Sequence, residues 1–452
     1  MRTHSISRRR FVGQAAVAGA AIGFPTVIPA RALARGGKAS PNAKVQVALL
    51  GCGSRSGYAA NYASYDKSAV VAVCDPVRER RLQRKQQFGG CADHADFREV
   101  LARPDVDAVH ISTADHWHVP LAVLAARAGK DVYCEKPLGI SIEQDLRARE
   151  IVDKHGRIFQ YGAQQRSLAQ VRMGIEVVLN GHIGEVQQAY IWAPRGEAGG
   201  GVAEAPVPEG FDYDLWLGPA PQAPFCADRC LHSGSNRNGI FHIYDYAIGF
   251  VAGWGAHPAD MLQWWLDHAG GAKMPVSCEA RGTIPTEGLF NTLTHWDAHF
   301  VYPGGLTMRF MDNETAGREK PHPGVAGGHG TLFVGSDGWV RVSRDGWEFS
   351  SEAIRQRAKD AGSKKLPVSK DQIHNFVDGV LSREQPVDDL HSAVRSDILC
   401  HLVDISARCG RKIAWDDRRE TVAGDRDAQR MMSRTLRKPW TLKRSWWDAL
   451  FG

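Results

Sequence analysis

The sequence predicts an α/β protein built from two domains: a doubly wound parallel sheet, then an α+β domain with an open, mostly antiparallel sheet. The chain has 452 residues. Single hydrophobic cores stop growing at roughly 250–300 residues, so more than one domain is expected. Apolar runs alternate with helical patterns up to residue 162, which is typical of parallel βαβ units. From residue 163 onward, strand-like runs follow one another through short turns, which favours antiparallel pairing.

The first predicted domain spans residues 35–162. Its expected strands are short apolar runs, as strands buried on both faces should be: Val45–Leu50, Ala69–Val73, Asp107–Ser112, Asp131–Tyr133 and Ile158–Tyr161. Between them, the predicted helix Val119–Ala128 has Pro120 in its first turn and Gly129 just past its end. A capping-box pattern that starts at Ser141 begins another helix, and Gly156 is expected to end it.

The second predicted domain spans residues 163–452. A helix around Arg172–Asn180 leads to a strand at Val186–Trp192, and a Gly- and Pro-rich stretch follows to about residue 240. The further expected strands are Val276–Ile284, Leu293–Val301, Leu306–Met311 and Thr331–Gly335. Helices are expected at Asp371–Ser382 and Leu390–Ala407. The sequence therefore predicts one sheet of neighbouring strands with helices after it.

Most of the net charge of +6 lies at the start of the chain. Residues 1–34 hold five arginines and no acidic residue: Arg2, Arg8, Arg9, Arg10 and Arg31. An apolar run from Ala15 to Ile28 and the sequence Ala32-Leu33-Ala34 follow, which predicts a signal peptide over residues 1–34. The paired arginines are typical of the twin-arginine type. The run is shorter than the roughly 20 residues that cross a bilayer, and an uncleaved membrane anchor is the alternative.

The charge that remains after this segment is small. Without residues 1–34 the chain carries six minus five positive charges, or +1. A nearly neutral protein has no electrostatic reason to bind nucleic acid or an anionic membrane. We therefore expect no nucleic-acid partner, no membrane span after signal cleavage, and a periplasmic or otherwise exported location.

The nine cysteines are scattered and odd in number, which argues against a disulfide framework. A loop disulfide between Cys226 and Cys230 stays open at this point. Together with His232 these two cysteines fit no standard zinc spacing, so no metal site is expected.

A glycine-rich turn after the first strand predicts a dinucleotide site. The turn reads Gly51-Cys52-Gly53-Ser54-Arg55-Ser56-Gly57, with its last glycine one position late for a strict G-x-G-x-x-G. Asp75 closes the second strand 22 residues after Gly53, where an acid would bind a ribose 2′-hydroxyl and disfavour a 2′-phosphate. NAD is therefore favoured over NADP, while Arg78 and Arg80 nearby keep NADP as the lesser alternative.

Two polar segments follow other strands of the same predicted sheet. Asp115-His116-Trp117-His118 comes after the strand that ends at Ser112-Thr113, and Glu135-Lys136-Pro137 comes after the strand at Val132. Both segments lie at carboxyl ends of parallel strands, where open α/β sheets bind their ligands.

The order G-C-G…S-T-A-D-H-W-H-V-P…G-K-D-V-Y-C-E-K-P-L resembles the glucose–fructose oxidoreductase/inositol dehydrogenase (Gfo/Idh/MocA) family. The likeness continues through residues 181–186, 216–221 and 254–260 and covers most of the chain. It implies an N-terminal Rossmann domain and a C-terminal domain whose open sheet is often used for oligomer contacts, so a homo-oligomer is expected. It also implies hydride transfer between a nicotinamide and a carbon of a sugar or cyclitol, so the expected partner is a small carbohydrate.

The resemblance implies two catalytic residues. Lys136 matches the lysine near the nicotinamide and the substrate hydroxyl, and His257 matches the catalytic histidine. Oxidation of an alcohol removes its O–H proton as hydride leaves, which a neutral imidazole or a desolvated lysine can do. The family usually has Asp four residues before this histidine, whereas this chain has Gly253. Asp245 or Tyr246 is a candidate substitute, and Asp260 would share a helical face with His257.

The residues expected to bind the cofactor come from the turn, the strand ends and one later arginine. They are Gly51, Gly53, Ser54, Arg55, Asp75, Thr113, His116, His118, Glu135 and Arg166. Arg166 and His118 are equally candidates for substrate contact.

Three functions stay open on the sequence alone. The first is an NAD-dependent oxidoreductase that acts on a sugar or glycoside. The second is redox-neutral glycoside cleavage, as in the similar NAD-dependent glycoside hydrolase family 109, and the third is a sugar-binding protein with a structural dinucleotide. The twin-arginine route resembles one used for folded proteins, which predicts a cofactor acquired before export. Because free NAD is scarce outside the inner membrane, that cofactor is expected to be tightly bound and recycled in place.

Overall fold

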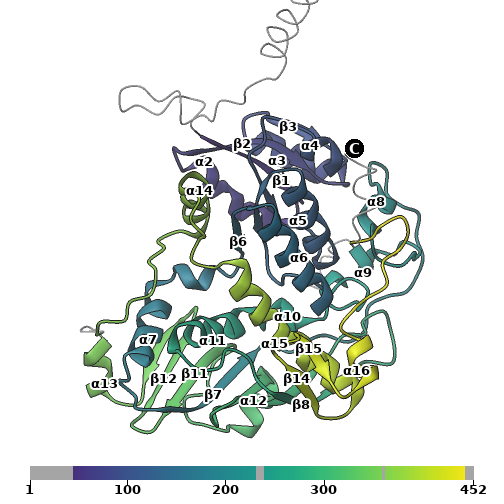
Figure 1. Cartoon of the computed structure of the whole chain (residues 1–452). Coiled ribbons are helices and arrows are strands. Elements are labelled where there is room, and N and C mark those ends of the chain that lie inside the picture. The colour runs from purple at the N-terminus through teal and green to yellow at the C-terminus, as the bar shows by residue number, and fades with distance from the viewer. Residues whose placement is uncertain (1–43, 231–238, 359–361, 443–452) are drawn as a thin grey trace, which may run out of the picture. The chain divides into compact units, whose positions relative to one another are not determined.

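The computed structural model describes residues 44–230, 239–358 and 362–442, and the elements below belong to one contact unit that starts at Val45. The predicted signal peptide lies outside the described residues. Two sheets organise the chain (Figure 1). No helix in the described ranges is both long and apolar enough to cross a membrane.

The first sheet has six strands, all parallel, in the order β3-β2-β1-β4-β5-β6. They are β1 (Val45–Leu50), β2 (Ser68–Cys74), β3 (Ala92–His94), β4 (Ala108–Ile111), β5 (Asp131–Cys134) and β6 (Phe159–Tyr161). This order confirms the predicted doubly wound parallel sheet. The sequence analysis missed β3 because its three residues are only half-buried and include Asp93 and His94, so no apolar run marks it.

The register of this sheet aligns the strand ends at one edge. Leu50 pairs with Cys74 and with Ile111, and Ile111 pairs with Cys134. The residues that follow these four positions therefore emerge side by side: Gly51, Asp75, Ser112 and Glu135. The strand order reverses between β1 and β4, which is where doubly wound sheets bind ligands.

Helices connect these strands as the sequence predicted. They are α2 (Ala60–Ala63), α3 (Arg78–Gln87), α4 (Phe97–Leu101), α5 (His118–Arg127) and α6 (Ile142–Lys154), with short 3-10 helices η3 (Ser54–Ala59) and η4 (Asp115–Trp117). The Ser141 hydroxyl accepts a hydrogen bond from the Gln144 amide, which confirms the predicted cap of α6. Gly156 then leaves the helix with φ of +59°.

The second sheet has nine strands in the order β13-β12-β11-β7-β10-β9-β8-β14-β15. They are β7 (Val186–Ala193), β8 (Ser277–Thr283), β9 (His295–Val301), β10 (Thr307–Asp312), β11 (Gly330–Gly335), β12 (Trp339–Ser343), β13 (Gly346–Phe349), β14 (Ile413–Asp416) and β15 (Thr421–Ala423). Only the β7–β10 pair is parallel, so the predicted open, mostly antiparallel sheet is confirmed. The sequence analysis missed β12 to β15, each of five residues or fewer.

Helices of the second half pack on this sheet and on one another. The helices are α7 (Ala169–Leu179), α8 (Tyr213–Leu217), α9 (Ala227–Cys230), α10 (Phe250–Gly253), α11 (Ala256–Ala269), α12 (Asn313–Glu319), α13 (Glu352–Arg357), α14 (Gln372–Ser382), α15 (Leu390–Cys409) and α16 (Arg426–Arg430), with η5 (Gln164–Ser167) and η6 (Gly239–Phe241). α11 packs against α15 and lies on β7 and β11 (Figure 1).

One late helix returns to the first sheet. Ile373, Phe376 and Val377 of α14 are buried in the same apolar cluster as Val47 and Leu49 of β1. Figure 1 shows α14 beside α2, at the upper left of the molecule as drawn. This helix lies in the predicted second domain by sequence, yet its apolar face completes the core of the parallel sheet.

Candidate active site

The carboxyl edge of the parallel sheet opens onto a cavity of about 480 Å³. Six of the residues predicted to bind a cofactor line it: Gly51, Gly53, Ser54, Arg55, Asp75 and Thr113. Later parts of the chain supply the opposite wall, which includes Leu215, Trp216 and Phe241. The cavity therefore lies where the strand order predicted a ligand site.

The two glycines of the turn serve different purposes. Gly51 has φ of +94°, and a Cβ atom there would lie 2.6 Å from the carbonyl oxygen of Ser112. A side chain at this position would collide with the segment that follows β4. Gly53 has no atom within 4 Å of its missing Cβ, so its backbone faces open space that a phosphate group can approach.

Asp75 is held in place by the turn itself. One carboxylate oxygen accepts the amide N–H of Cys52 at 2.7 Å, and the other accepts the amide N–H of Val77 at 2.8 Å. Burial raises the pKa of this carboxyl group, while the two amides oppose that shift. Each oxygen keeps a second lone pair, so the carboxylate fits a ribose hydroxyl.

Arg84 also shapes the turn, and the sequence analysis missed it. Its guanidinium donates to the Ser56 hydroxyl at 2.8 Å and to the Gly53 carbonyl at 3.0 Å. No local signal distinguishes Arg84 from the other charged residues of α3. The open glycine, the buried acid and the cavity together fit a dinucleotide.

The two predicted catalytic residues meet beside this edge. Lys136 follows β5, and its Nζ donates to the main-chain carbonyl of Gly253, at the end of α10. His257 lies in the first turn of α11, is 3% exposed, and its Nε2 lies 3.1 Å from a guanidinium nitrogen of Arg344. The Nδ1 atom has no hydrogen-bond partner among the described residues.

The electrostatics of the pair favour uncharged bases. Burial lowers the pKa of His257 well below its ordinary value, and the positive charges of Lys136, Arg344 and Arg55 lower it further. Burial also lowers the pKa of Lys136, although Asp115 and Glu135 oppose this shift. A neutral imidazole and a lysine that loses its proton more readily than usual can both accept the proton of a hydroxyl group.

At Gly253, where the family usually has Asp, a main-chain carbonyl takes the place of the carboxylate. Lys136 bonds the carbonyl of Gly253 rather than a carboxylate. Asp245 is exposed and lines a second cavity of about 210 Å³. The Tyr246 hydroxyl accepts a hydrogen bond from Arg229 at 3.0 Å, and its ring is fully buried. The structure therefore brings neither Asp245 nor Tyr246 to His257.

Three predicted cofactor residues support the site from outside the cavity lining. Glu135 forms an ion pair with Arg55 at 2.8 Å. The Nδ1 of His118 donates to the carbonyl of Pro137 at 2.6 Å, which fixes the Lys136 loop. His116 donates from Nε2 to the carbonyl of Trp216 at 3.1 Å. Burial lowers the pKa of both histidines to about 4, so each is neutral and holds main chain.

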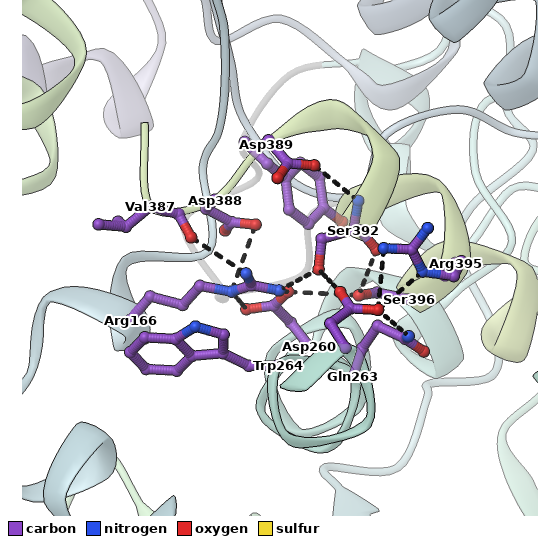
Figure 2. Close-up of polar contacts among 12 residues, drawn as sticks. Arg166, Asp260, Gln263, Trp264, Val387, Asp388, Asp389, Ser392, Arg395 and Ser396 are labelled. Carbon is purple, nitrogen blue, oxygen red and sulfur yellow. Dashed lines mark hydrogen bonds and ion pairs between the residues drawn. The ribbon is translucent and has the colours of Figure 1, made fainter. Parts of the chain in front are cut away.

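Arg166 lies in a separate buried network (Figure 2). Its guanidinium donates to both carboxylate oxygens of Asp260, at 2.8 and 2.5 Å, and to the Ser392 hydroxyl at 2.5 Å. The third nitrogen donates to the carbonyl of Val387 at 3.0 Å. Arg166 is thus committed to protein partners instead of cofactor or substrate, and Asp260 pairs with Arg166 instead of joining His257.

The cysteines and metal-ligating residues give no further site. All nine cysteines are free, including the buried Cys226 and Cys230, whereas His232 lies outside the described residues. Within the described ranges no three His, Cys, Asp or Glu side chains are grouped to hold a metal ion.

Comparison with known proteins identifies the two halves of the chain. Residues 45–163 match the oxidoreductase family model for an NAD-binding Rossmann fold, and residues 174–442 match the model for the family's C-terminal alpha/beta domain. The chain belongs to the Gfo/Idh/MocA oxidoreductase family. Its first domain is therefore an NAD-binding Rossmann domain, in agreement with the cavity, Gly53 and Asp75.

Individual relatives are similar over shorter stretches. The scyllo-inositol 2-dehydrogenase (NAD(+)) of Bacillus subtilis is 35% identical over 125 residues, which is 27% of this chain and 36% of that enzyme. A glycosyl hydrolase family 109 protein of Solibacter usitatus is 28% identical over 151 residues, 30% of this chain and 34% of that protein. The chain thus matches about a third of the length of each relative.

A solved structure extends the likeness to the whole fold. The aldose-aldose oxidoreductase of Caulobacter crescentus superposes with a TM-score of 0.57 at 19% identity, covering 82% of this chain and 99% of that one. At this identity the likeness concerns the fold alone.

Proposed function

We propose that this protein is an NAD-dependent oxidoreductase that transfers hydride between its cofactor and a hydroxyl-bearing carbon of a sugar or cyclitol. One observation carries the proposal: Lys136 is held on the Gly253 carbonyl, one turn before the buried His257, and its neighbour Glu135 pairs with Arg55 of the NAD cavity. Proton-accepting groups thus stand beside the place where the family binds NAD.

The residues of this chain divide the work. The Gly51–Arg55 turn would face the pyrophosphate of the cofactor, and Asp75 would bind its ribose. Bound NAD supplies the hydride acceptor. The neutral amine of Lys136 or the neutral imidazole of His257 accepts the hydroxyl proton, so charge does not build up on the substrate oxygen. Arg55 and Glu135 couple the cofactor wall to the Lys136 loop.

We also propose export by the twin-arginine route, with the cofactor bound tightly before export and recycled in place. The order of basic start, apolar run and cleavage motif in residues 1–34 supports this location. A homo-oligomer built on the open nine-stranded sheet is part of the same proposal. Periplasmic fractionation of the full chain and of an Arg8→Lys, Arg9→Lys variant tests the export route.

A second candidate is redox-neutral glycoside cleavage. The similarity to a family 109 protein favours it, whereas the expected scarcity of free NAD outside the inner membrane applies equally to both candidates. In that reaction, oxidation of a sugar hydroxyl acidifies the neighbouring C–H, elimination expels the leaving group, water adds, and the hydride returns to the sugar. The balance is hydrolysis with no net reduction of NAD.

Product analysis separates the two candidates. The purified full chain is incubated with NAD and a panel of sugars, inositols and glycosides. We expect a keto sugar and an equal amount either of reduced nicotinamide or, where the cofactor is recycled in place, of a reduced second sugar. Free monosaccharide with no net reduction would favour cleavage, and a chain that binds no dinucleotide would overturn both. Lys412→Ala, a change at an exposed lysine, is the matched control for Lys136→Ala.

A further inference from the structure

Arg344 is an exposed cation that reaches His257 from the nine-stranded sheet. It lies in the turn between β12 and β13. One of its guanidinium nitrogens is 3.1 Å from Nε2 of His257. None of the ion pairs among the described residues includes it. A guanidinium keeps its proton in proteins, so Arg344 donates and His257 presents the lone pair of Nε2.

An aromatic ring fixes the direction of this guanidinium. The centre of the guanidinium lies 5.4 Å from the centroid of the Trp254 ring, close enough for a cation–π contact. The same ring contacts His257 at 6.0 Å and His329 at 5.6 Å between ring centroids. Trp254 thus presents Arg344 and His257 together, on one platform beside Lys136.

Two of the cations around this platform have no direct ion-pair partner among the described residues. Lys136 and Arg344 have no carboxylate in ion-pair contact within the described chain, and Arg55 has Glu135 alone. Burial and the nearby Arg55 lower the pKa of Arg344 while Asp345 opposes this shift, and burial lowers that of Lys136 while Asp115 and Glu135 oppose the shift and Arg55 and Arg344 add to it. Cations that lie near one another without a direct ion-pair partner are stabilised when a ligand supplies a negative charge.

We propose that the sugar substrate carries an anionic group, a carboxylate or a phosphate, and that Arg344 binds it. This inference rests on the proposed function and names the substrate class of the same site. A hydrogen bond between two charged groups is roughly twice as strong as one between neutral groups. The anion therefore draws Arg344 away from His257, and Nε2 becomes free to accept a hydrogen bond from the sugar hydroxyl.

Arg344 is thus a specificity-determining residue. It binds the charged sugar, and this binding frees Nε2 of His257 to accept a hydrogen bond from the sugar hydroxyl. A neutral sugar leaves the guanidinium on Nε2. The sequence gives no local sign of this role, because Arg344 lies 87 residues beyond His257 in the chain.

Binding measurements on the full chain with NAD present test the proposal. The probes are D-glucose, D-glucuronate and D-glucose 6-phosphate, which share a ring and differ in charge, and calorimetry gives each Kd. We expect one charged probe to bind at least roughly tenfold more tightly than D-glucose, the factor that one charge-assisted contact supplies. If D-glucuronate binds more tightly, the anionic group of the substrate is a carboxylate. If D-glucose 6-phosphate binds more tightly, the substrate is a sugar phosphate.

Substitutions decide whether Arg344 is responsible. Arg344→Gln should remove the preference for the charged probe, and Arg344→Lys should keep only part of it because the planar fork is lost. Arg419→Gln, at a side chain that is 81% exposed, should keep the preference of the wild type. Circular dichroism checks that all three variants are folded.

Three results would overturn the inference. Either D-glucose binds as tightly as both charged probes, or neither charged probe binds to a chain that binds NAD; a preference that survives Arg344→Gln counts equally against it. Turnover of a neutral sugar with reduction of NAD would leave the proposed function standing in each case. Failure to bind NAD at all would instead remove the proposed function.

Discussion

His257 and Asp260 lie three residues apart on α11, yet their surroundings differ in one decisive respect. Asp260 is fully buried with both oxygens paired to Arg166, and a hydroxyl of Ser396 lies 3.2 Å away. His257 is also buried, but its neighbours Lys136 and Arg344 have no ion-pair partner in the described chain. One turn of helix therefore separates a carboxylate that is paired on both oxygens from a histidine whose neighbouring cations have no ion-pair partner in the described chain.

The difference shows which cluster serves the fold and which serves the ligand. The Arg166 network ties η5, α11 and the start of α15 together, since Ser392 also donates to Asp267, and Asp267 binds Arg395 (Figure 2). Within it the Asp260 carboxylate and the Arg166 guanidinium are paired with protein groups, whereas both oxygens of the buried Asp388 lack a hydrogen-bond partner among the described residues. The cluster around His257 combines an Nδ1 that has no hydrogen-bond partner with two cations that form no ion pair in the described chain, and a substrate and cofactor can complete it.

The largest expected effect is on turnover. Lys136→Ala removes a proton acceptor, so we expect kcat to fall by roughly 10²–10⁴-fold, the usual contribution of general base catalysis. Binding of NAD should stay near the wild-type Kd because Lys136 does not line the cavity. Steady-state kinetics and calorimetry measure the two effects. Unchanged turnover would exclude Lys136 from the reaction, and Lys412→Ala is expected to behave as the wild type.

The next largest expected effect is on the free energy of unfolding and concerns the Arg166–Asp260 network. Asp260→Asn leaves Arg166 with its main counter-ion removed, although Asp388 lies 3.4 Å from it. Breaking a buried ion pair costs about 3 kcal/mol or more of unfolding free energy. Urea denaturation measures this loss. Asp427→Asn, at a side chain that is 72% exposed, should change the unfolding free energy by less than about 0.5 kcal/mol. Equal stability of the two variants would refute the structural role of the network.

The pH profile of sugar oxidation tests the protonation of Lys136 and His257. Lys136 must lose its proton to act as a base, and its pKa is lowered by burial. Activity should therefore rise with pH and level off below about 10.4, the ordinary lysine pKa. His257, whose pKa lies well below its ordinary value, should add no inflection near about 6.5. An inflection there, absent from a His257→Gln variant, would contradict a neutral His257.

The smallest change restores the acid that the family usually carries. A Cβ atom on Gly253 would meet Phe250 at 3.4 Å, an ordinary contact, so Gly253→Asp should fold. A carboxylate on the residue that binds Lys136 should raise the lysine pKa by roughly one unit or more. The rise of activity should then shift to higher pH by the same amount. An unshifted profile would show that the lysine does not control it.

The elements found from the sequence are those whose signal is local. Buried strands such as β1 and β4 are continuous apolar runs, and the α6 cap needs only Ser141 and its near neighbours. β3 was missed because its residues are half-buried and polar. The packing of α14 on β1 joins residues more than 300 positions apart, and no local pattern encodes such a contact.

The site residues also differ in whether a local signal predicts them. The glycine turn, Asp75 and Lys136 follow strands directly, so their place at the sheet edge could be predicted from sequence order. Arg166 was a candidate for cofactor or substrate contact, and Asp260 was expected to share a helical face with His257. The pairing of these two residues with each other depends on tertiary packing. Arg344 reaches His257 across the fold, from a turn that no motif marks.

Transfer of a labelled hydrogen tests the central claim most directly. The full chain is incubated with NAD and a panel of sugars and inositols deuterated on carbon, and the reduced nicotinamide is analysed by mass spectrometry. We predict one deuterium in the reduced cofactor, with a keto product in equal amount, and a rate of deuterium transfer lower by roughly 10²-fold or more with Lys136→Ala. Reduced nicotinamide without deuterium, or no reduction with any member of the panel, would contradict hydride transfer from a sugar carbon at this site.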